Sequence, residues 1–152
     1  MNLTTSELKK AENYILEEII KCKDMLYYIE NYIHIYDVDK SDFIKFTLWD
    51  EQKKAILDFD KNRLNIALKS RQIGMTWLVI GYSNYKMMFT PGYKVLAISA
   101  SESHGFEMID RMEIMLKNLP KWLIRGYKER VRGMPYWDST KAEVVVHFPD
   151  GQ

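Results

Sequence analysis

The sequence has little cysteine, glycine or proline and no long hydrophobic run, and these shortages limit what the protein can be. Its 152 residues include one cysteine, Cys22, so an internal disulfide and a zinc site built from cysteines are excluded. Seven glycines, four prolines and 47% hydrophobic residues are typical of a chain that folds. No apolar run approaches the roughly 18 residues that span a bilayer, and the polar N-terminus does not resemble a secretory signal. We therefore expect one domain of ordinary size in a reducing cytoplasm, without a membrane segment.

The net charge of +1 conceals an uneven distribution along the chain. Residues 1–50 carry six lysines against ten carboxylates, whereas residues 51–100 carry eight basic residues against three acidic ones. The remaining residues hold eight of each sign. An anionic ligand is therefore expected in the middle third, although the overall balance does not favour a protein that coats DNA.

The N-terminal segment, residues 1–42, reads as one long amphipathic helix. Thr4 and Glu7 fit a capping box at its start. Apolar residues then recur at steps of three or four and form one stripe; they are Ala11, Ile15, Ile19, Cys22, Leu26, Ile29 and Ile33. This stripe is either a coiled-coil seam or, as we expect, the face that packs on the rest of the domain. The polar residues 37–42 predict its end.

The following residues alternate between helical and strand-like patterns. Thr47 and Asp50 predict the start of a second helix, and residues 75–88 and 102–117 predict two more. The short apolar runs 65–69 and 94–99 lack helical phase and indicate buried strands. Strand, helix, strand and helix in succession predict an α/β fold with a parallel sheet of three or four strands flanked by helices.

The last residues alternate as a strand at an exposed sheet edge would, over 143–148. Asp150-Gly151 is a strong hairpin-turn signal, yet no second strand follows it. We therefore expect the chain to be the front part of a larger domain and to expose a sheet edge.

A loop between the predicted strand and helix, residues 69–76, has the position of a phosphate-binding loop. Unpaired N–H groups at a helix N-terminus attract anions, and Gly74 lets the backbone approach a phosphate closely. Thr76 stands where a hydroxyl that binds Mg²⁺ belongs. Against the usual G-x-x-x-x-G-K-[ST] pattern, Lys69 replaces the first glycine and Met75 replaces the lysine.

This loop, Lys69-Ser70-Arg71-Gln72-Ile73-Gly74-Met75-Thr76, resembles the deviant phosphate-binding loop of large terminase subunits, the DNA-packaging ATPases of tailed phages. The segments that carry the rest of the resemblance are Phe46–Gln52, which is similar to an adenine-recognition motif, and Asn62–Lys69, Ser99–Ser101, Leu119–Leu123 and Val146–Gly151. It extends from about residue 26 to the end. The resemblance implies that residues 43–152 are the N-terminal part of a P-loop ATPase domain that uses ATP and Mg²⁺.

The resemblance also implies a role for each site residue. The nucleotide-binding set would be Gln52, Trp49, Lys69, Ser70, Arg71, Gln72, Ile73, Gly74, Met75 and Thr76. Gln52 would read adenine, with Trp49 or Phe46 as an aromatic platform, and Thr76 would hold the Mg²⁺ of the nucleotide. Because Met75 cannot neutralise phosphate, Arg71 would take over from the absent lysine, with Lys69 second to it. The apolar run ending in Asp-Glu, which supplies the water-activating Glu, is absent, so we expect nucleotide binding without turnover.

The parent protein implied by the resemblance drives double-stranded DNA into a procapsid in the host cytoplasm. Its partners would be the DNA, the portal protein, the small terminase subunit and a ring of identical subunits. Two alternatives stay open. One is a helicase or restriction-type translocase, which would normally keep the loop lysine; the other is a non-catalytic helical assembly module with a degenerate loop. Arg125, Arg130 and Arg132 are candidate arginine fingers, although a solvated basic loop is the preferred interpretation.

Overall fold

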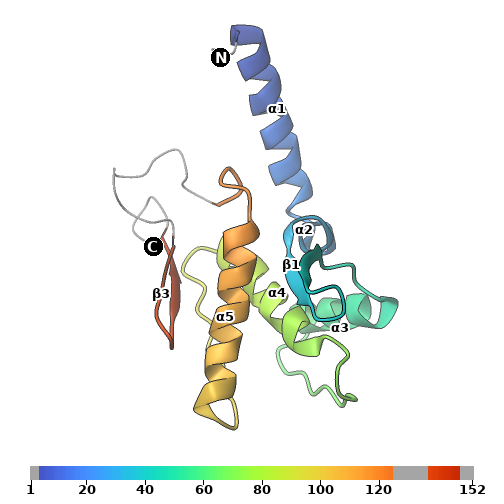
Figure 1. Cartoon of the computed structure of the whole chain (residues 1–152). Coiled ribbons are helices and arrows are strands. Elements are labelled where there is room, and N and C mark those ends of the chain that lie inside the picture. Colours follow the sequence, from blue (N-terminus) through green and yellow to red (C-terminus); the bar gives the residue numbers. More distant parts are fainter. Residues whose placement is uncertain (1–3, 125–136, 148–152) are drawn as a thin grey trace.

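The computed structural model describes residues 4–124 and 137–147 of the chain. The elements in chain order are α1 (Thr5–Lys21), α2 (Met25–Tyr32), β1 (His34–Asp37), β2 (Asp42–Lys45), α3 (Asp50–Lys61), α4 (Met75–Phe89), α5 (Glu102–Asn118), β3 (Trp137–Ser139) and β4 (Val144–Val146). Helix α1 projects from a body in which α4 and α5 pack together and α2, α3 and the strands surround them (Figure 1).

The single N-terminal helix of the prediction is in fact two helices. The capping box at its start is confirmed, because the backbone N–H and hydroxyl of Thr4 both donate to Glu7. However, α1 ends at Lys21 and α2 begins at Met25, with Asp24 as its cap accepting from the N–H of Tyr27 at 2.7 Å. Within the stripe, Ala11 is exposed, Ile15, Ile19 and Leu26 are half-buried, and Cys22, Ile29 and Ile33 are buried, so the stripe packs on the body mainly towards its C-terminal end. A local cap inside the stripe therefore outweighs the continuous periodicity.

The polar run after α2 forms the tip of a hairpin rather than a plain break. Strands β1 and β2 pair antiparallel, with His34 opposite Lys45 and Asp37 opposite Asp42. The carboxylate of Asp37 accepts from the N–H groups of Asp39 and Lys40, which fixes the turn. Such aspartate turns are local features that helical periodicity does not reveal.

The predicted parallel sheet of three or four strands is absent from the part of the chain that the structure describes. The two sheets there are antiparallel pairs, β1–β2 and β3–β4, and the segments 65–69 and 94–98 are extended but have no backbone partner. The α/β P-loop architecture expected from the sequence is therefore wrong for this structure. The physical reason is that an apolar run becomes a strand only where another strand pairs with it.

The hydrophobic core lies between the helices. The fully or almost fully buried large side chains are Tyr28, Ile29, Ile33, Ile56, Leu78, Met115 and Leu116. They come from α2, α3, α4 and α5, except Ile33, which is the C-cap of α2. The predicted helices 75–88 and 102–117 are confirmed with small shifts at their ends. Helix α4 contacts α2, α3 and α5 and is therefore the central element of the body.

The predicted C-terminal strand is confirmed within the described residues as β4. Its partner, β3, precedes it in the chain. Trp137 of β3 lies opposite Val146, and Ser139 lies opposite Val144. The hairpin packs beside α5 (Figure 1). The predicted turn at Asp150-Gly151 and the candidate fingers Arg125, Arg130 and Arg132 lie outside the described residues.

No helix among the described residues combines the length and apolar character needed to cross a bilayer.

Candidate functional site

The site predicted from the sequence is built on the start of α3. The helix begins at Asp50 with Trp49 as its N-cap, so the predicted capping pair of Thr47 and Asp50 is wrong. Instead, the side-chain oxygen of Gln52 accepts from the N–H of Trp49 at 3.0 Å. This bond places the Gln52 amide, which is 6% exposed, at the junction between α3 and the loop before α4.

The same amide holds the loop. Nε2 of Gln52 donates to the carbonyl of Ile73 at 2.9 Å, across 21 positions of sequence. The next residue, Gly74, is the N-cap of α4 and has φ +69°, a left-handed conformation that favours glycine. A Cβ at Gly74 would lie 3.0 Å from Nε2 of Gln52. The loop is therefore fixed by one buried side chain and one glycine.

The loop backbone turns sharply before α4. Gln72 also has a positive φ, of 62°, so two left-handed residues flank Ile73. No side chain caps the start of α4, which leaves N–H groups of its first turn available to a ligand. A left-handed residue at a helix start aims consecutive backbone N–H groups toward one region, an arrangement that suits phosphate oxygens.

The basic side chains of the loop are exposed. Among the described residues, neither Lys69 nor Arg71 takes part in an ion pair, and Nζ of Lys69 lies 3.5 Å from the carbonyl of Ser70. Ser70 is exposed as well. These cations are therefore free to meet an anion that lies at the start of α4.

The remaining predicted residues occupy three different settings. Thr76 is half-buried in the first turn of α4, and its hydroxyl makes no hydrogen bond within the described chain. Met75 packs against the core. Trp49 is 60% exposed and lies beside Gln52, whereas Phe46 is 3% exposed and belongs to the core. Of the two aromatic platforms considered, only Trp49 can stack on a ligand.

The structure thus brings Gln52 into contact with Ile73 and Gly74. Lys69 and Arg71 are exposed residues of the same loop. Sequence reasoning assigned Gln52 to the adenine base but missed its bond to Ile73. The sequence does not reveal the hydrogen bond between Gln52 and Ile73, because this bond depends on how α3 and α4 pack against each other. A side-chain amide has two donors and two acceptor positions, so Gln52 keeps capacity for one further partner of each kind.

No group of three or more metal-ligating side chains lies in the described part of the chain. Nε2 of His147 lies 2.7 Å from the Asp138 carboxylate in an exposed pair. The loop before α4 is the candidate site that the geometry supports.

A scan against models of known protein families gives no match for this chain.

Proposed function

We propose that the loop Lys69–Thr76 binds the phosphate groups of ATP and that the chain belongs to an ATP-driven machine that moves double-stranded DNA, as large terminase subunits do. The observation that carries the proposal is the Gln52 amide, which ties the loop carbonyl of Ile73 to the start of α3 immediately before the left-handed Gly74. This arrangement holds the N-terminus of α4 open and preformed, so an anion pays little ordering cost on binding.

Charge supports the same ligand. A nucleotide triphosphate needs cations as well as backbone N–H groups, and Met75 supplies none. Arg71 has a planar fork of donors that matches phosphate oxygens, and its side chain is exposed and has no ion pair in the described chain. We assign Arg71 the phosphate contact and Lys69 a supporting role.

The residues present also fit Mg²⁺ carried by the nucleotide. The metal prefers oxygen ligands and keeps several waters when it is bound through phosphates and one or two protein groups. The Thr76 hydroxyl, in the first turn of α4, is the oxygen that this chain would offer. When bound, the ion would neutralise phosphate charge.

We propose that this chain binds nucleotide but does not hydrolyse it. The apolar run ending in Asp-Glu that would supply the water-activating carboxylate is absent from the 152 residues, and general-base help is typically worth about 10²–10⁴ in rate. The parent machine would act in the host cytoplasm, with DNA, portal protein and small terminase subunit as partners and with a ring of like subunits.

Calorimetric titration of the chain with Mg²⁺ and a non-hydrolysable ATP analogue tests the proposal. We expect saturable binding that Arg71→Ala weakens by about 1.5–3 kcal/mol, the range for a hydrogen bond to a charged group. Lys54→Ala is the matched control, because Lys54 is an exposed cation on α3 and is not part of the loop Lys69–Thr76. An isotherm without heat for the unaltered chain, or equal affinity in Arg71→Ala, contradicts the proposal.

One observation favours the assembly-module alternative. Helix α1 extends away from the body (Figure 1) and leaves Leu8, Leu16 and Ile20 between 48% and 63% exposed. Such a face on a projecting helix is typical of subunit association. This alternative would be supported if the chain binds no nucleotide but associates through α1. In that case Leu16→Glu with Ile20→Glu should make the chain monomeric.

A further inference from the structure

Two extended segments of the chain expose aliphatic side chains to an unusual degree. In the segment 64–69, Leu64, Ile66 and Leu68 are 87%, 101% and 102% exposed. In the segment 94–98, Leu96 and Ile98 are 85% and 83% exposed. Isolated exposed leucines are common, but five on two segments without backbone partners indicate an interaction surface.

The backbones of these segments are also open. No backbone–backbone hydrogen bond involves residues 64–69 or 94–98 within the described chain. Every residue of the two segments is exposed: the first carries Asn65 and Lys69 beside its apolar residues, and residues 95–98 are all apolar. An unpaired backbone with exposed apolar side chains is what strand addition by another peptide requires.

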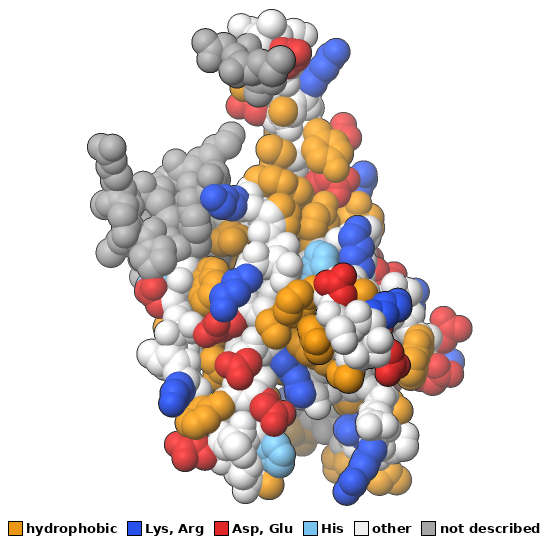
Figure 2. All heavy atoms as spheres, in the orientation of Figure 1, with side chains coloured by type: hydrophobic (Ala, Val, Ile, Leu, Met, Phe, Trp, Pro, Cys, Tyr) orange, Lys and Arg blue, Asp and Glu red, His pale blue; other side chains and the backbone are white. Residues whose placement is uncertain are grey.

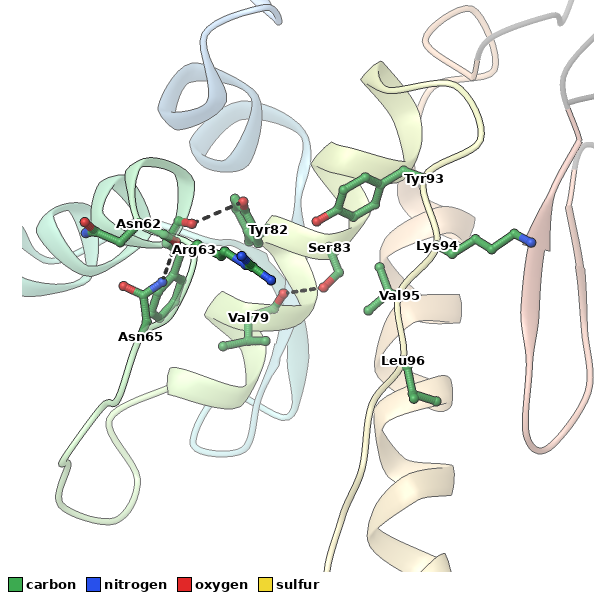
Figure 3. A pocket seen from close by; sticks show the side chains of 11 residues that line it. Asn62, Arg63, Asn65, Val79, Tyr82, Ser83, Tyr93, Lys94, Val95 and Leu96 are labelled. Atoms are coloured by element: carbon green, nitrogen blue, oxygen red, sulfur yellow. Dashed lines mark hydrogen bonds between the residues drawn. The ribbon is translucent and has the colours of Figure 1, made fainter.

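A groove of about 430 Å³ lies between the two segments, as Figure 3 shows. Helix α4 forms its floor through Val79, Tyr82 and Ser83, while Asn65 and Val95 stand on opposite sides. The Ser83 hydroxyl donates to the carbonyl of Val79 at 2.9 Å, so this polar group of the floor is already satisfied. The floor therefore accepts apolar side chains.

The charge of the groove selects among peptides. The described residues that line it include two cations, Arg63 and Lys94, and no carboxylate. The nearby Asp60 is already paired with Lys86 at 2.5 Å, whereas Arg63 and Lys94 have no ion pair in the described chain. A peptide with carboxylates would complement this lining.

We propose that the groove binds an extended strand of a different polypeptide, with alternating aliphatic side chains and flanking carboxylates. The strand would pair its backbone with residues 64–69 and 94–98 and place its side chains on α4. A second copy fits less well, because its β4 is paired with β3. Its own unpaired segments, 64–69 and 94–98, carry Lys69 and Lys94 and no carboxylate, so cations would meet cations. This inference goes beyond nucleotide binding and does not rest on it.

Fluorescence anisotropy of the whole chain with labelled peptides tests the proposal. The probe alternates Val and Thr between two Glu ends; one control has Lys ends, and another has a central Pro that cannot donate to the ladder. We expect the Glu-ended peptide to bind about tenfold more tightly than the Lys-ended one, and the Pro peptide not to saturate. Hydrogen exchange should then slow at residues 64–68 and 94–98. Absent binding, equal binding of the three peptides, or protection elsewhere overturns the proposal.

A charge-reversed variant sharpens the test. Arg63→Glu with Lys94→Glu should invert the preference in favour of the Lys-ended peptide, while Lys10→Glu with Lys54→Glu, on exposed faces of α1 and α3, should not. Circular dichroism establishes that each variant is folded. Nucleotide titration of the groove variant should match that of the unaltered chain, which separates this proposal from the loop. Protection of both segments that rises with protein concentration, without peptide, would assign the groove to a second copy and overturn it.

Discussion

At the scale of single residues, the chain contains two glycines in nearly the same conformation but in different surroundings. Gly74 and Gly92 have φ values of +69° and +68°. Nothing lies within 4 Å of a Cβ built on Gly92, whereas a Cβ on Gly74 meets the Gln52 amide at 3.0 Å. The pair therefore separates the cost of the left-handed backbone from the cost of disturbing the candidate site.

We predict that Gly92→Ala lowers the free energy of unfolding by about 1 kcal/mol, the cost of a left-handed alanine. Gly74→Ala should cost about 1 kcal/mol more, because Gln52 must move and weaken its bond to Ile73. Urea unfolding of the two variants measures the difference. Equal losses would show that the Gln52 contact contributes nothing to stability.

Gln52 itself gives a second prediction at this scale. Gln52→Ala should narrow the preference for ATP over GTP, with a loss of about 1–3 kcal/mol of binding free energy if the amide reads adenine. Competitive titration with the two nucleotides measures this preference, and Glu51→Ala, an exposed neighbour, is the control. Equal weakening for ATP and GTP would limit Gln52 to holding the loop.

At the scale of elements, one buried carboxylate joins α1 to α2. Glu18 is 5% exposed and accepts from Lys21 at 2.8 Å, from the Tyr32 hydroxyl at 2.5 Å and from the Tyr27 hydroxyl at 3.0 Å. The hydrogen bond from Lys21, followed by that from Tyr32, lowers the pKa of Glu18 to about 2. These bonds set the angle at which α1 leaves the body.

The Glu18 cluster predicts a loss of stability in acid. A carboxylate with a pKa lower in the folded than in the unfolded chain stabilises the fold above the unfolded value of 4.5. That contribution should disappear as the pH falls from about 4.5 towards 2. Urea unfolding across this range measures it; Glu18→Gln should lack this component, while Glu17→Gln, an exposed neighbour on α1, should retain it. Identical pH profiles for the unaltered chain and Glu18→Gln would contradict the assignment.

The elements also show which parts of the fold can be predicted from the sequence. Contacts within a few residues determine helices α4 and α5 and the Thr4–Glu7 cap, so the local sequence patterns were sufficient to predict them. The runs 65–69 and 94–98 have the composition of buried strands, but a strand needs a distant partner, which a local pattern cannot supply. The start of α4 after the loop was predicted correctly for the first reason. The strand expected before the loop is absent, and the link to Gln52 was missed, for the second.

At the scale of the whole molecule, a buried polar link holds three helices together. Asn84 of α4 is 1% exposed; its side-chain oxygen accepts from the Tyr28 hydroxyl of α2 at 2.6 Å, and its Nδ2 lies 3.4 Å from the sulfur of Met112 in α5. Burial raises the pKa of Tyr28 well above its usual value, so the phenol stays a donor. The surface around this core mixes charges of both signs with apolar patches (Figure 2).

This link predicts strong coupling between Tyr28 and Asn84. Asn84→Ala strands the buried hydroxyl and Tyr28→Phe strands the amide oxygen, so each should lower the free energy of unfolding by about 1–3 kcal/mol. The double variant should cost less than the sum by about 1 kcal/mol, because the second change removes the group that the first left unpaired. Urea unfolding of the four chains gives the coupling, and Tyr14→Phe, whose ring is 59% exposed on α1, is the control for losing a phenol. Strict additivity would mean that water satisfies each stranded group, and that the packing of α2, α4 and α5 holds the body together without this polar link.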